Sequence, residues 1–128
     1  MVEVRLSARC FKTEDRGKIV SAFKLLFPDA EVEGDDPITA TAKSVERFGE
    51  LLRQQRIRDA ARSIMRKGLS GASTHFILNK QVATVGKVSF SQESHPLGDI
   101  DVTVSDNDIE GLIDAIAPRT RQGGGVGS

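Results

Sequence analysis

The spacing of the apolar residues switches repeatedly between a period of two and a helical period, and this switching constrains the fold most. Residues 2–10 are apolar at every second position, which predicts a half-buried strand. Residues 13–27 then carry apolar side chains at helical spacing, with Thr13 as the expected N-cap and Pro28 as the stop. The chain therefore begins with a strand followed by a helix.

The middle of the chain predicts a hairpin followed by two helices. Residues 30–34 and 37–42 are short β-type stretches on either side of an acidic turn. Residues 44–67, starting at a possible Ser44 cap, carry two apolar faces that point in opposite directions. We therefore expect two helices, or a sharp bend, near residues 54–56, with Gly68 ending the region.

The last third predicts three strands and a helix. Residues 74–90 fit two strands, with residues 79–81 between them or distorting one, and 91–98 a polar loop. Residues 99–104 alternate, and a capping box from Ser105 to Asp108 precedes a short helix that ends at Pro118. The predicted order is β-α-ββ-αα-βββ-α. This order favours a single α+β domain at residues 1–118, a mostly antiparallel sheet with helices packed on one face. Residues 119–128 are expected to be a flexible Gly-rich tail.

Composition narrows the class of protein. The 128 residues suit one domain, and 18 basic against 18 acidic residues argue against a uniformly basic nucleic-acid clamp. The apolar runs are too short for a membrane span, and the N-terminus lacks the apolar region of a signal peptide. One cysteine excludes an internal disulfide. We expect a cytoplasmic protein that makes no membrane contact.

Charge is segregated along the chain although its total is zero. Residues 28–42 hold five acidic and no basic groups, and residues 99–114 hold six acidic groups. Residues 43–67 hold eight basic and three acidic groups. Blocks of this kind predict a dipolar surface on the folded protein.

The basic block supplies the first candidate site. It contains Arg53, Gln54, Arg56, Arg58 and Arg62, followed by Arg66. On a helix, Arg58, Arg62 and Arg66 form one ridge, and guanidinium groups along a ridge can contact successive phosphates. The alternative is a solvated helix face whose charges only keep the protein in solution.

A polar segment supplies the second candidate. Asn79 and Gln81 could read base edges, while Lys80 and Lys87 could meet an anion. The alternative is an ordinary turn with two exposed lysines. Gly86 and Lys87 do not form a phosphate loop, because the required upstream glycine and downstream Ser or Thr are missing.

Other chemistry-bearing residues have simpler explanations. Helix capping and a solvated strand face account for the aspartates at 99, 101, 106 and 108, and neither His75 nor His95 has a ligand partner at metal spacing. Cys10 is expected to be an inert core thiol. The chain has no Trp or Tyr, and its six Phe mostly fit core positions, which disfavours a base-stacking sheet. We expect no metal, no cofactor and no catalytic residues.

Several segments resemble one archaeal family of uncharacterised proteins. They are KTED at 12–15, LFP at 26–28, LRQQRIRDAAR at 52–62, FILNKQVATVGKVSF at 76–90, LGDIDV at 97–102 and IAPRT at 116–120. The resemblance implies RNA binding and a fold similar to that of large-subunit ribosomal protein five. It implies no catalytic residues, and it directs attention to the candidates at 53, 54, 56, 79–81 and 87.

Three functional hypotheses remain open. The first is a non-enzymatic domain for structured RNA or a ribonucleoprotein, with Arg53, Arg56, Arg58 and Arg62 on phosphates and residues 79–81 adding polar contacts. The second is a homodimeric protein-interaction module that pairs complementary acidic and basic surfaces and has no nucleic-acid role. The third is an enzyme or small-anion binder, for which no nucleophile–base pair is visible. Close pairing of the arginines with acidic residues would count against the first.

Overall fold

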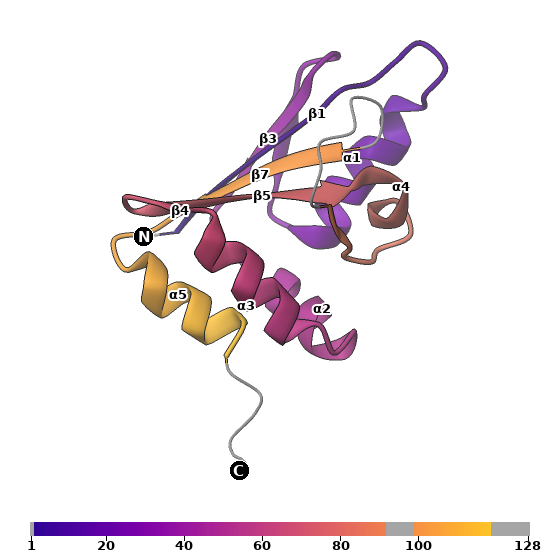
Figure 1. The fold of residues 1–128 in the computed structure, drawn as a ribbon. Helices are drawn as coiled ribbons and strands as arrows, with labels where there is room; N and C mark the ends of the chain where they lie inside the picture. The colour runs from indigo at the N-terminus through magenta and orange to yellow at the C-terminus, as the bar shows by residue number, and fades with distance from the viewer. Residues whose placement is uncertain (1, 92–98, 119–128) are drawn as a thin grey trace.

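One antiparallel sheet with helices on one face makes up the fold in the computed structural model, which describes residues 2–91 and 99–118 (Figure 1). The elements are β1 (Glu3–Ala8), α1 (Arg16–Leu26), β2 (Glu31–Glu33), β3 (Ile38–Ala42), α2 (Glu46–Gln54), α3 (Arg58–Lys67), β4 (Leu69–Ser70), β5 (Ser73–Asn79), α4 (Lys80–Ala83), β6 (Phe90–Ser91), β7 (Asp99–Ser105) and α5 (Ile109–Ile116). The predicted α+β class and element order are confirmed, with β4 and α4 as short additions.

The sheet has the strand order β2-β3-β1-β7-β5-β4, and β6 pairs with β5. Leu6 of β1 lies opposite Ala40 on one side and Val102 on the other, and all three side chains are buried. Because side chains alternate along a strand, this register sends every buried residue of the central strands to the same face. That face carries the helices, and the other face stays open.

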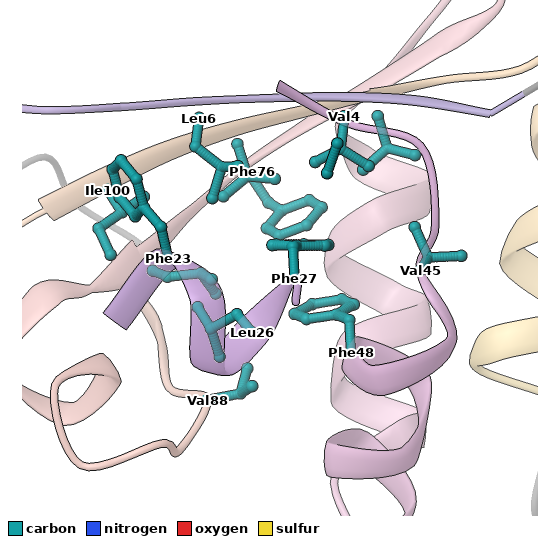
Figure 2. Close-up of a cluster of buried hydrophobic side chains, with 14 of the residues drawn as sticks. Val4, Leu6, Phe23, Leu26, Phe27, Val45, Phe48, Phe76, Val88 and Ile100 are labelled. Atoms are coloured by element: carbon teal, nitrogen blue, oxygen red, sulfur yellow. The ribbon is translucent and has the colours of Figure 1, made fainter. Parts of the chain in front are cut away.

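Phenylalanine rings fill the space between the sheet and the helices (Figure 2). Phe48 of α2 stacks against Phe27 at 5.4 Å and against Phe76 of β5 at 5.6 Å, measured between ring centroids. Phe90 meets the rings of Phe48 and Phe76 edge-on. These rings stabilise the core and are not available to stack on bases.

Three predictions for the middle of the chain are confirmed. α2 ends at Gln54 and α3 begins at Arg58, so the opposed apolar faces do belong to two helices. Gly68 is the C-cap of α3, and residues 31–33 and 38–42 form the predicted hairpin.

Other local predictions are wrong. α1 is capped by Asp15 rather than Thr13, because the Asp15 carboxylate accepts the Gly17 N–H at 2.8 Å. Asp108 replaces Ser105 as the N-cap of α5 by accepting the Gly111 N–H at 3.0 Å. The second strand predicted within 74–90 shrinks to Phe90–Ser91, since α4 begins directly after β5.

Some expectations fall on residues that the structure does not describe. The predicted tail at 119–128, most of the polar loop and His95 lie outside the described residues. Within residues 2–91 and 99–118, every helix is too short or too polar to cross a membrane.

Candidate nucleic-acid interface

The turn between α2 and α3 places an arginine in an uncommon backbone conformation. Arg56 has φ 59°, the left-handed region. Its N–H donates to the Arg53 carbonyl at 3.1 Å, and the Ile57 N–H donates to the Leu52 carbonyl at 3.0 Å. These two bonds form a Schellman motif, which ends a helix at a left-handed residue that is usually glycine. We call residues 53–58 the α2–α3 corner.

Apolar contacts hold the corner in place. Leu52 is fully buried, and Ile57 is partly buried against the same core. A hydrophobic contact between these two positions commonly accompanies a Schellman motif. The backbone therefore turns sharply at Arg56, whose side chain is exposed.

The Gln55 side chain hydrogen-bonds the backbone of Val88 and so connects the corner to the segment that follows α4. Its Nε2 donates to the Val88 carbonyl at 2.8 Å, and its Oε1 accepts the Val88 N–H at 2.7 Å. Lys87 thus lies beside the corner, and two candidate groups that are about 30 residues apart in sequence become neighbours. The sequence gives no sign of this role for Gln55, because Gln54 and Gln55 stand side by side and only the fold decides which of them meets Val88.

The arginines of the corner carry unneutralised charge. Arg53 and Arg56 are exposed and Arg58 is half-buried. Within residues 2–91 and 99–118, none of the three forms an ion pair. Gln54 and Lys87 are also exposed. The corner therefore carries three arginines and the exposed Gln54 amide, and Lys87 adds a fourth cation beside it.

The predicted arginine ridge is divided. Arg62 pairs with Asp114 of α5 and donates to the Ala117 carbonyl at 3.4 Å, and only 16% of its side chain is exposed. Arg66 pairs with Glu110 of α5 at 3.5 Å. The acidic helix α5 therefore neutralises the far end of the ridge, and the corner end has no ion pair with any of the described residues.

The segment after β5 is largely engaged inside the fold. The Asn79 side chain caps α4 by accepting the Val82 N–H at 3.0 Å, while Gln81 is exposed. Lys80 is 1% exposed, and its ammonium donates to Glu14 at 2.8 Å and to the Arg9 carbonyl at 3.0 Å. Lys80 and Asn79 thus join α4 to β5 and to the loop before α1.

The charge of Lys80 is balanced where it is buried. Burial raises the pKa of the Glu14 carboxyl, but the hydrogen bonds from Lys80 and from the Phe11 N–H lower it by more than burial raises it. The pKa of Glu14 therefore lies below its usual value. The Arg9 guanidinium, together with the Cys10 N–H, likewise lowers the pKa of Asp36. Both carboxylates are therefore ionised at neutral pH.

The open face of the sheet is acidic, whereas the corner is basic. Glu3, Glu31, Glu33 and Asp101 lie on this face, because their strand neighbours point into the core. His75 of β5 lies 3.3 Å from Asp101 on the same face. In the part of the chain that is described, no three His, Cys, Asp or Glu side chains gather closely enough to hold a metal ion.

Comparisons with known proteins give a consistent assignment. A family model described as RNA binding matches residues 3–105. A UPF0200/UPF0201 protein of Archaeoglobus fulgidus is 40% identical over 126 residues, and this chain covers 39% of that protein's length. That match spans 95% of this chain.

Solved structures extend the likeness to the fold. The crystal structure of an uncharacterized UPF0201 protein matches 92% of this chain and 94% of its own, with a TM-score of 0.85 and 39% identity. The UPF0201 protein from Methanococcus jannaschii matches 94% and 96%, with a TM-score of 0.83 and 41% identity. The predicted likeness to large-subunit ribosomal protein five stays a prediction.

Proposed function

This chain belongs to the family described as RNA binding, and we propose that it binds structured RNA, without catalysis, through phosphate groups at the α2–α3 corner. The observation that carries the proposal is Arg56, an exposed cation held in a left-handed conformation. Glycine would adopt that conformation more easily and would keep the turn. Arg56 occupies this position at a conformational cost of about 1 kcal/mol relative to glycine, and this cost supports a binding role for its side chain.

Charge distribution supports the same surface. The acidic segments are partly neutralised elsewhere, since Asp35 pairs with Arg16 at 3.2 Å and Asp36 with Arg9 at 2.6 Å. α5 neutralises the far end of the ridge. The corner, with Lys87 beside it, therefore remains a local positive area on a neutral protein. Guanidinium groups there suit phosphate oxygens, which a bidentate fork contacts well.

Structured RNA suits this surface better than an extended single strand. The six phenylalanines are buried or partly buried, and the chain has no Trp or Tyr. Single-strand binders usually stack bases on exposed aromatic rings. Phosphate contacts would thus come from Arg53, Arg56, Arg58 and Lys87, and polar contacts from Gln54 and Gln81, while Arg62, Asn79 and Lys80 have partners inside the fold.

The test is the affinity for a stem-loop RNA, measured by fluorescence anisotropy over a series of salt concentrations. The variant is Arg56→Glu/Arg58→Glu, and the charge-matched control is Lys12→Glu/Lys18→Glu, which changes two exposed lysines near the start of α1. We expect wild type and control to bind with a steep salt dependence, and the corner variant to lose binding. Equal loss in variant and control would refute the corner as the site.

The homodimeric module remains an alternative with less to support it. It depends on acidic and basic blocks being free to pair between subunits, yet several of those charges pair within the chain. Light scattering after size exclusion tests it, because a dimer that dissociates at high salt is the expected result of charge pairing.

A further inference from the structure

A hollow of about 530 Å³ lies between α2 and α5, next to the start of β1. Its apolar lining includes Val2, Val45, Leu112 and Ile116. The volume falls within the range of clefts that hold small organic groups, about 300 to 1,000 Å³. Gly49 lets the two helices approach closely, because a side chain there would come within 3.3 Å of Ile116. The hollow is therefore a product of how α5 docks on α2.

The charged residues around the hollow are not evenly distributed. Arg53 and Arg58, which lack ion pairs in the described part of the chain, line it at the corner. Glu46 lines it two helical turns before Arg53, about 10 Å away along α2. Lys43 and Glu50 also line it, and Glu50 is paired with Arg47 at 3.2 Å. The end at the corner thus suits an anion, and the opposite end offers the Glu46 carboxylate as an acceptor together with the Lys43 ammonium as a donor.

We propose that the hollow receives one unstacked nucleotide of the bound RNA. Its phosphate would lie between Arg53 and Arg58, its base on the aliphatic lining, and Glu46 would accept an N–H of the base. The inference rests on the proposed function and names the class of RNA: a helix interrupted by a bulge or loop. Arg53 lines the hollow and is also part of the α2–α3 corner, where its carbonyl accepts the Arg56 N–H. RNA bound at the corner can therefore reach the hollow. Sequence-specific recognition of RNA commonly uses such splayed bases.

The test compares two hairpins that differ by a single bulged nucleotide. We expect the wild type to bind the bulged hairpin about fivefold more tightly or better than the fully paired one, which is the gain from burying about 40 Å² of the base on the apolar lining. Ala115 lines the hollow and is exposed, so Ala115→Phe should fill the hollow without disturbing the core. This variant should lose the preference and keep the affinity for the paired hairpin. Ala60→Phe, on an exposed position of α3 outside the hollow, should retain both.

Separate outcomes bear on the two proposals. A wild type that binds both hairpins equally overturns the hollow as a nucleotide site and leaves RNA binding standing. A retained preference in Ala115→Phe also overturns it. Failure to bind either hairpin refutes RNA binding itself. As a second measurement, methyl NMR should show shifts at Leu112 and Ile116 with the bulged hairpin alone; shifts of equal size with both hairpins contradict the inference.

Discussion

Replacing Arg56 by glycine should stabilise the protein and weaken its binding to RNA. Arg56 occupies the left-handed position of the Schellman motif that ends α2, at φ 59°. Its N–H bond to Arg53 and the neighbouring bond from Ile57 to Leu52 involve only backbone atoms, so Arg56→Gly can keep both. Only the side chain and its charge are lost.

The gain in stability can be worked from the backbone. The left-handed conformation costs a residue with a side chain about 1 to 2 kcal/mol. Glycine in turn lowers the stability by about 0.5 to 1 kcal/mol, because it has more conformational freedom to lose when the unfolded chain folds. The net gain is about 0.5 to 1 kcal/mol. With an unfolding entropy of about 2.1 cal/mol/K for each of roughly 110 described residues, the melting temperature should rise by about 2 to 4 °C.

Thermal unfolding and RNA titration of the same samples provide the assay. Loss of one phosphate contact should reduce the slope of log affinity against log salt by about 0.7 to 0.9. Arg56→Ala is the matched control, because it removes the charge but keeps a side chain at the left-handed position; its affinity should fall equally, without the rise in melting temperature. A lower melting temperature for Arg56→Gly would show that the left-handed conformation costs Arg56 nothing, and an unchanged salt slope would show that its side chain contacts no phosphate.

Further predictions concern the contacts around the corner and the buried ion pair. Gln55→Ala should cost about 1 to 3 kcal/mol and speed hydrogen exchange at the Val88 amide, whose partner it removes. Glu14→Gln should cost about 2 to 4 kcal/mol in urea denaturation, because it leaves the Lys80 ammonium buried without a counter-charge. Since the pKa of Glu14 is lowered on folding, its contribution is complete above about pH 4.3 and is lost as pH falls through the lower folded value; acid unfolding of Glu14→Gln should lack that part of the pH dependence. Arg62→Ala should reduce stability by about 1 to 3 kcal/mol, because this side chain is only 16% exposed and its hydrogen bonds to Asp114 and to the Ala117 carbonyl are lost. RNA affinity should stay within twofold, because α5 already neutralises this arginine; a large loss of affinity would return Arg62 to the site.

Hydrophobic periodicity predicted most of the fold. The opposed apolar faces of residues 44–67 predicted two helices or a sharp bend, and the alternation in residues 2–10 and 99–104 predicted two strands, which are β1 and β7. Their place side by side in the middle of the sheet is set by the pairing of the strands and was not predicted. Local patterns failed where two structures compete for one residue. Asn79 ends β5 and also caps α4, so residues 80–83, which were predicted as part of a connection or of a distorted strand, form a helix.

The candidate site was predictable in its residue types but not in its arrangement. Arg58 and Arg62 look equivalent on a helical ridge, and only the docking of α5 separates them. The burial of Lys80 depends on Glu14, 66 positions earlier in the chain. The left-handed turn occurs at Arg56 and not at a glycine, so the residue type does not predict it. Each of these outcomes is set by tertiary contacts, which a local pattern does not contain.

NMR of the labelled protein during titration with a stem-loop RNA tests directly whether RNA binds at the α2–α3 corner. Amide shifts report which residues lie at the bound surface, and they do so without a mutation. We expect shifts at residues 53–58 and 86–88, on the helix side of the molecule, that vanish as salt is raised. Shifts confined to the acidic open face around Glu31 and Asp101, or no shifts at low salt, would contradict binding at the corner.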